Sequence, residues 1–97
     1  MDKASALERL RACQPQLEAL GVRSLYLFGS TQRGTAQAGS DVDLFLDYVE
    51  GRFDLFDLVA VKNLLSSVLP AAVDVTTRGS LHPRLRDDIE RGAVRVF

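Results

Sequence analysis

Two aspartates, Asp41 and Asp43, are separated by one residue, a spacing at which both carboxylates could belong to one reactive site. Asp41 and Asp43 lie at the start of the apolar run at residues 42–46, which is typical of a buried strand. Because side chains alternate faces along a strand, we expect both carboxylates on one face, with their Cα atoms about 7 Å apart. An acidic pair beside a buried run costs folding free energy unless it is hydrated, paired with a positive group or holding a cation.

A third acid, Asp74, stands alone in the apolar sequence AVDVT. If its strand lies beside the strand of Asp43, three carboxylates converge, and they repel one another unless a hard divalent cation such as Mg²⁺ accepts their oxygens. Two such ions about 4 Å apart activate an attacking hydroxyl and stabilise a leaving oxygen in phosphoryl chemistry. The sequence therefore predicts a reaction site at Asp41, Asp43 and Asp74 that uses two Mg²⁺ ions.

A glycine-serine pair precedes the acidic motif. Gly29 and Ser30 follow the β-rich run at residues 25–28 and begin a small-residue stretch, as in a tight strand-to-helix turn. Glycine lets the backbone come close to a ligand, and the free amides of a helix start, with the Ser30 hydroxyl, can donate to phosphate oxygens. A triphosphate fits this turn. Arg33, one turn further along, is placed to add positive charge.

The arrangement of these two motifs resembles a known family signature. Gly29-Ser30, ten residues, and then Asp41-x-Asp43 resembles the signature of the DNA polymerase β-like nucleotidyltransferase superfamily. The sequences RG and SDVDL around the motif agree with it. The leading helix, LYLFGS, VDV and IERGAVRVF are similar to the minimal nucleotidyltransferase (MNT) proteins, so the resemblance covers most of the chain.

The resemblance implies a specific activity. Such proteins typically act as antitoxins beside a HEPN-domain ribonuclease toxin, which implies transfer of AMP from ATP to a tyrosine of that toxin. By the same resemblance, Asp41 and Asp43 would bind both metals. Asp74 would bind the catalytic metal and help to deprotonate the acceptor hydroxyl. The alternative is a non-catalytic antitoxin or regulatory module that neutralises its partner by complex formation; the intact carboxylates and Gly-Ser turn favour the enzyme.

The hydrophobic spacing predicts helices and strands in the order α, β, short α, β, α, β, α, β. The leading helix should be kinked or split at Pro15 and end at Gly21. A well-buried helix over residues 53–69 should use Leu55, Phe56, Leu58 and Val59 among its core residues. The alternative is that this helix, apolar on more than one side, covers a partner. The order predicts an α/β (α+β) protein, and the resemblance implies a small mixed β-sheet flanked by helices with the polymerase β palm-like fold.

The composition is that of a small globular domain. The chain has 46% hydrophobic residues, a formal net charge of −1 and one cysteine. It has no clustered basic field, no apolar run long enough for a membrane and no signal-peptide features, which predicts a cytoplasmic protein without direct nucleic-acid or membrane partners. We expect one domain over residues 1–97. Since so short a chain leaves little room for an acceptor pocket, we expect a hetero-oligomer in which the partner brings the acceptor hydroxyl.

Overall fold

The computed structural model describes residues 2–29 and 41–97 of the chain. Its elements are α1 (Lys3–Ala12), α2 (Gln14–Ala19), β1 (Val22–Phe28), β2 (Val42–Tyr48), α4 (Leu55–Val68), β3 (Val73–Thr77), the 3-10 helix η1 (Arg78–Ser80), α5 (Arg86–Gly92) and β4 (Val94–Arg95). These elements follow the predicted order, and the short helix predicted after Gly29 lies outside the described residues. None of the described helices is both long enough and apolar enough to cross a membrane.

The leading helical segment is split, as predicted. Asp2 caps α1 by accepting a hydrogen bond of 2.8 Å from the Ser5 amide. The helix is interrupted at Cys13, and Pro15 lies in the first turn of α2, where a missing amide hydrogen breaks no helical hydrogen bond. Cys13 is buried. Gly21 ends the segment with φ +99°, a left-handed conformation that glycine adopts without steric cost.

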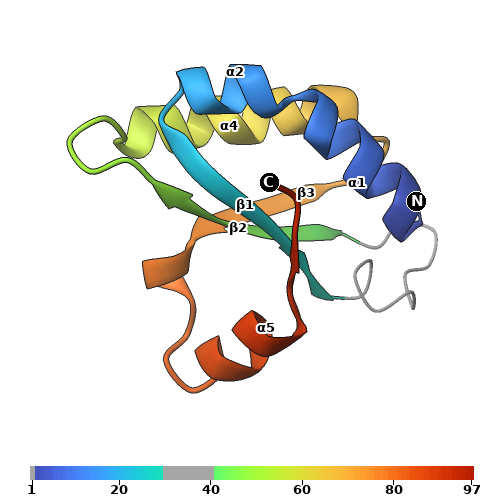
Figure 1. The fold of residues 1–97 in the computed structure, drawn as a ribbon, viewed down its shortest axis with the longest axis vertical. Coiled ribbons are helices and arrows are strands. Elements are labelled where there is room, and N and C mark those ends of the chain that lie inside the picture. The colour runs from blue at the N-terminus through green and yellow to red at the C-terminus, as the bar shows by residue number, and fades with distance from the viewer. Residues whose placement is uncertain (1, 30–40) are drawn as a thin grey trace.

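The four strands form one mixed sheet in the order β3-β2-β1-β4 (Figure 1). β1 pairs antiparallel with both β2 and β4, whereas β2 pairs parallel with β3. A parallel pair needs a crossover connection, and α4 supplies it between β2 and β3. The structure therefore confirms the predicted α+β class with a small mixed sheet and flanking helices.

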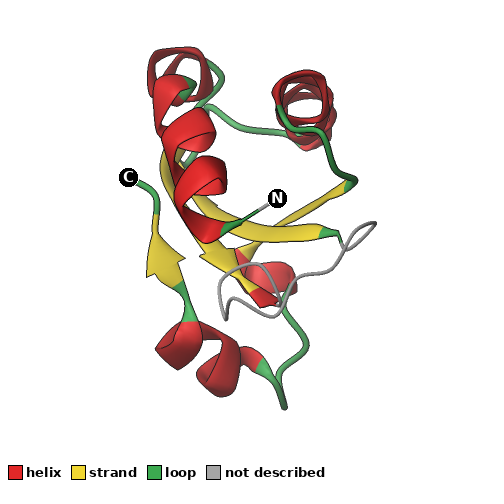
Figure 2. Ribbon diagram, turned by 90° about the vertical axis from the view of Figure 1, so that its right-hand side faces the viewer, coloured by secondary structure: helices red, strands yellow, loops and turns green. Residues whose placement is uncertain are grey.

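The two faces of the sheet have different coverage. Helices α1, α2 and α4 lie over one face, whereas α5 lies on the other, which we call the open face (Figures 1 and 2). Along β2, Val42, Leu44 and Leu46 belong to the core on the covered face. The alternate positions 43, 45 and 47 therefore point to the open face. The core also contains Ala6, Leu10, Leu17, Leu25, Leu27, Val61 and Leu65.

The first half of α4 differs from the prediction of a well-buried helix. The helix begins with a capping box, in which the Asp54 and Asp57 side chains each accept a hydrogen bond of 3.0 Å from the other's amide. Leu55, Phe56 and Val59 are 72%, 85% and 50% exposed, so the expectation that they form core is wrong. The helix is apolar on more than one side, but only the side with Val61 and Leu65 faces the sheet.

Candidate active site

Asp43 and Asp74 lie opposite each other on adjacent strands. In the parallel pair β2–β3, Asp43 is in register with Asp74. Neighbouring strands are about 4.8 Å apart, and residues in register point to the same face. The two side chains therefore leave the open face as neighbours, as expected if the strand of Asp74 lies beside that of Asp43.

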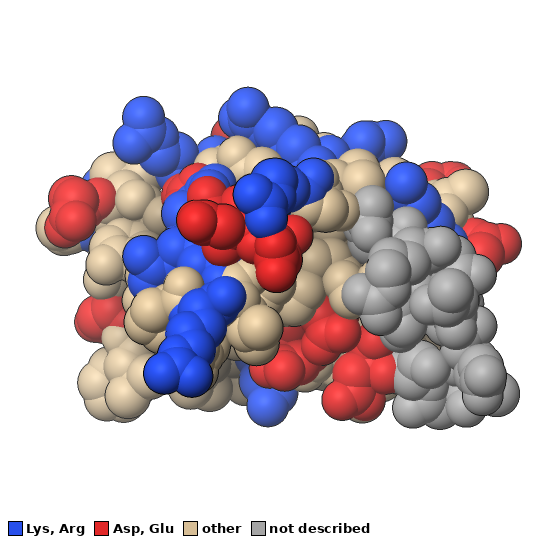
Figure 3. Space-filling model, turned by 90° about the horizontal axis from the view of Figure 1, so that it is seen from below, with Lys and Arg blue, Asp and Glu red and all other residues tan. Residues whose placement is uncertain are grey.

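Asp41 lies directly before β2 and is exposed, as is Asp74, whereas Asp43 is partly buried. Asp43 has a neighbour on its other side as well, since it pairs with Phe28 of β1. Seen from below, the molecule has acidic side chains gathered in the lower middle of the view, whereas Lys and Arg lie mainly along its upper and left parts (Figure 3). The acidic part of this face is suited to cations rather than to a bare anion.

Gly29 brings the end of β1 against Asp43. Its φ is +80°, in the region that favours glycine. A Cβ atom added at Gly29 would lie 3.1 Å from the carboxyl carbon of Asp43 and closer still to its Oδ2. The backbone of the turn therefore occupies the space beside the carboxylate, and the predicted glycine turn meets the acidic strand. Ser30 and Arg33, the other predicted nucleotide-binding residues, lie outside the described residues.

The chemistry of the carboxylates fits Mg²⁺, which prefers oxygen ligands. Asp43 and Asp74 in register place two carboxylates on one face, and Asp41 lies two residues before Asp43. Within residues 2–29 and 41–97, no three Asp, Glu, His or Cys side chains are grouped so that they could hold a metal ion as they stand. Binding an ion through all three aspartates therefore requires their side chains to turn toward a common point.

A second charged group on the open face was missed by the sequence reasoning. Arg78 donates two hydrogen bonds to Asp47, from Nε to Oδ1 at 2.8 Å and from Nη2 to Oδ2 at 2.9 Å. Its Nη1 donates to Glu90 Oε2 of α5 at 2.8 Å. Ser24 donates from its hydroxyl to Asp47 Oδ2 at 3.1 Å. Arg78 thus joins β2 to α5.

Three aromatic rings lie on the open face, two from β1 and one from β2. The Tyr26 and Phe45 rings are stacked, with centroids 4.8 Å apart, and Phe28 packs against Phe45 at 5.8 Å. The guanidinium carbon of Arg78 lies 4.9 Å from the Tyr26 centroid and 5.0 Å from that of Phe45. Arg78 therefore covers part of this aromatic row and gains a cation–π contact.

The contacts between Arg78 and Asp47 shift the pKa values of both side chains. The hydrogen bonds from Arg78 hold the pKa of Asp47 below its usual range, and Ser24 and Arg23 add smaller effects in the same direction. The same contacts raise the pKa of Arg78. The sequence carried a signal for Asp47, because it has the same strand parity as Asp43. It carried none for Arg78, which follows β3 and reaches its partners through a long side chain.

The mixed sheet, with in-register carboxylates beside a glycine turn, has the features of a nucleotidyltransferase. The nucleotidyltransferase domain family matches residues 7–96, so the chain belongs to this family. The family resemblance inferred from the Gly29-Ser30 and Asp41-x-Asp43 motifs is thereby confirmed.

Several known proteins are similar to the chain. A Methanocaldococcus jannaschii protein named "Putative protein adenylyltransferase" is 42% identical over 83 residues, which are 86% of this chain and 88% of that protein. Protein adenylyltransferase MntA of Thermococcus cleftensis is 33% identical over 79 residues, 81% of this chain and 79% of that protein. A solved structure described as a "putative minimal nucleotidyltransferase" is 34% identical with a TM-score of 0.83, covering 97% of this chain and 95% of the other. A crystal structure of a toxin-antitoxin with AMP-PNP shares the fold at 21% identity and a TM-score of 0.72, covering 90% and 72%.

Proposed function

We propose that the protein is a Mg²⁺-dependent nucleotidyltransferase that transfers AMP from ATP to a hydroxyl of a partner protein. The observation that carries this proposal is the register of Asp43 with Asp74, beside the Gly29 turn, in a chain of the nucleotidyltransferase family. Relatives named for protein adenylyltransferase activity support AMP as the transferred group and a protein as the acceptor.

The nucleotide is held at the turn after β1. Gly29 lets the backbone come close to the triphosphate. The Ser30 hydroxyl and the positive charge of Arg33 are suited to its oxygens. The fold neighbour solved with AMP-PNP supports ATP as the substrate.

The three carboxylates are the proposed metal-binding and catalytic groups. Asp41, Asp43 and Asp74 would hold two Mg²⁺ ions, which supply neutralising charge for the phosphate oxygens. The acceptor oxygen forms a bond to the α-phosphorus of ATP, while the bond from that phosphorus to the bridging oxygen breaks. Asp74 accepts the proton of the hydroxyl, and pyrophosphate leaves with the electron pair. The products are the adenylylated protein and pyrophosphate.

The acceptor in this proposal is a tyrosine of a HEPN-domain ribonuclease toxin, and the protein acts as its antitoxin in the cytoplasm. The toxin-antitoxin assemblies among the fold neighbours support a protein partner. The family resemblance supports HEPN as the type of partner. In a complex of this kind the partner presents its hydroxyl to the open face, where Asp43 and Asp74 lie.

Intact mass of the partner tests this proposal. The protein is incubated with ATP, Mg²⁺ and the protein encoded beside it, in parallel with the variants Asp43→Asn and Asp87→Asn. Asp87 is an exposed acid of α5, so its variant controls for loss of one surface charge. We expect AMP addition with the wild type and Asp87→Asn but not with Asp43→Asn. Neutralisation of the partner by Asp43→Asn without any mass change would instead show the contact-only antitoxin.

A further inference from the structure

Helix α5 has few features of its own that would hold it in place. It has seven residues, no side-chain hydrogen bond at its N-cap and no fully buried residue. Isolated helices shorter than about 12 residues are marginal in water, so tertiary contacts must stabilise α5. The helix nevertheless lies against the open face of the sheet, on the side opposite to α1, α2 and α4 (Figures 1 and 2).

The polar contacts of α5 divide into local and long-range ones. Arg86 donates from Nη2 to the Gly79 and Leu81 carbonyls at 3.2 and 3.4 Å, which ties the helix only to the turn that precedes it. Among the ion pairs of the described residues, Arg78–Glu90 is the one that links α5 to the group on β2. This pair therefore adds a side-chain link between α5 and the sheet to the backbone link through β4, which pairs with β1.

Arg78 is itself held firmly. Its planar guanidinium makes a bidentate contact with Asp47 and stacks over the Tyr26 and Phe45 rings. A lysine at this position would keep the charge but would lose the fork of donors and the flat stacking surface. The Arg78 side chain therefore has a fixed position between the sheet and Glu90 of α5.

We infer that Arg78 is a positioning residue that fixes α5 as a wall of the open face on which the acceptor protein rests. This inference depends on the proposed function. The covered face of the sheet is filled by core, so an acceptor reaches Asp43 and Asp74 from the open face, where α5 lies. Leu85, at the N-cap of α5, is 54% exposed and provides an apolar contact for such a partner.

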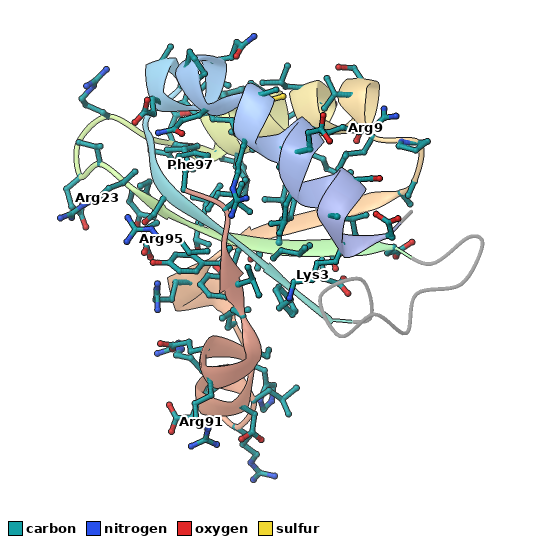
Figure 4. The ribbon with its side chains drawn as sticks, turned by 45° about the vertical axis from the view of Figure 1, so that its right-hand side comes forward. Lys3, Arg9, Arg23, Arg91, Arg95 and Phe97 are labelled. Carbon is teal, nitrogen blue, oxygen red and sulfur yellow. The ribbon has the colours of Figure 1, made fainter. Side chains whose placement is uncertain are left out.

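The test compares Glu90→Ala and Arg78→Lys with a matched control. Glu18→Gln removes one exposed charge from α2, which lies across the sheet from Arg91 of α5 (Figure 4). Hydrogen exchange of the residue 86–92 amides reports the docking of α5. Steady-state transfer to the protein encoded beside this one reports KM for the acceptor, KM for ATP and kcat.

We expect Glu90→Ala to speed amide exchange in α5 and to raise KM for the acceptor, each by about two- to fivefold. KM for ATP and kcat should remain within about twofold of the wild type, since the proposed nucleotide site adjoins Gly29 and Asp43, whereas Arg78 and Glu90 adjoin Asp47. Arg78→Lys should behave in the same way, and Glu18→Gln should match the wild type.

Three results would overturn the inference. Unchanged amide exchange in Glu90→Ala would show that the ion pair does not hold α5. Faster exchange with an unchanged acceptor KM would show that α5 does not position the acceptor. Equal effects on all kinetic constants would show a merely structural role. If the wild-type protein transfers no AMP, the proposed function fails and this inference fails with it, whereas the other results leave the proposed function intact.

Discussion

Gly29 lies against the carboxyl group of Asp43, which leaves no room for a side chain between the turn and the acidic strand. The turn residue and the acid are 14 positions apart in the sequence but are adjacent because β1 and β2 pair, with Phe28 opposite Asp43. The position of the carboxylate therefore depends on the absence of a side chain at Gly29.

Replacement of Gly29 by alanine should reduce transfer strongly. The new methyl group would displace the Asp43 carboxylate, and misplacing a reacting group by about 1 Å can cost about a hundredfold in rate. We expect kcat to fall by about this factor. Steady-state kinetics of AMP transfer measure the effect.

Gly51→Ala provides the matched control for this variant. Gly51 has a φ of +78°, close to the +80° of Gly29, but an added Cβ would meet nothing within 4 Å. Both variants should lose about 1 kcal/mol of stability from backbone strain, whereas only Gly29→Ala should lose activity. Equal activity in the two variants would show that the contact with Asp43 has no functional effect.

The Asp47–Arg78 pair should make stability depend on acid pH. Arg78 holds the pKa of Asp47 below its ordinary value of 3.8, so the pair stabilises the fold above that pH. The contribution is lost as the pH falls through the lower pKa of the folded protein. We expect Asp47→Asn to cost about 1–2 kcal/mol at pH 7, and we expect the difference from the wild type to shrink below the ordinary pKa. Urea unfolding at several pH values, with Asp87→Asn as the control, measures this stability difference. A difference that does not change with pH would contradict an ionic contribution from the Asp47–Arg78 pair.

The two sides of α4 should respond differently to truncation. Phe56 is 85% exposed, so Phe56→Ala should change the free energy of unfolding by no more than about 0.5 kcal/mol. Leu65 is fully buried, and Leu65→Ala should cost about 2–5 kcal/mol through lost packing and a cavity. Thermal or urea unfolding distinguishes them. A large cost at Phe56 would place that side chain in a packed environment.

The order of elements could be predicted from the sequence because each is encoded locally. Apolar spacing marks the helices, β-rich runs mark the strands, and Pro15 and Gly21 mark the division and end of the leading helix. The orientation of α4 could not be predicted. Leu55 and Val59 are as apolar as Leu65, and only packing against the sheet decides which side is buried.

The acidic motif could be predicted from the sequence, whereas the charged group of Arg78, Asp47 and Glu90 could not. Asp41 and Asp43 are two residues apart, so strand alternation alone places them, and Asp74 stands out in an apolar run. The contacts of Arg78 with Asp47 and Glu90 span 31 and 12 positions and depend on the parallel pairing of β2 with β3. No local pattern records that pairing.

The positions of bound nucleotide and metal test the proposed active site most directly. The measurement is a crystal structure of the protein with Mn²⁺ and AMP-PNP, in which anomalous scattering locates the metal. We predict metal at Asp43 and Asp74, shared with Asp41, and phosphates beside Gly29 and Ser30. Nucleotide bound at another surface, with Asp43 and Asp74 free of metal, would contradict the proposed active site.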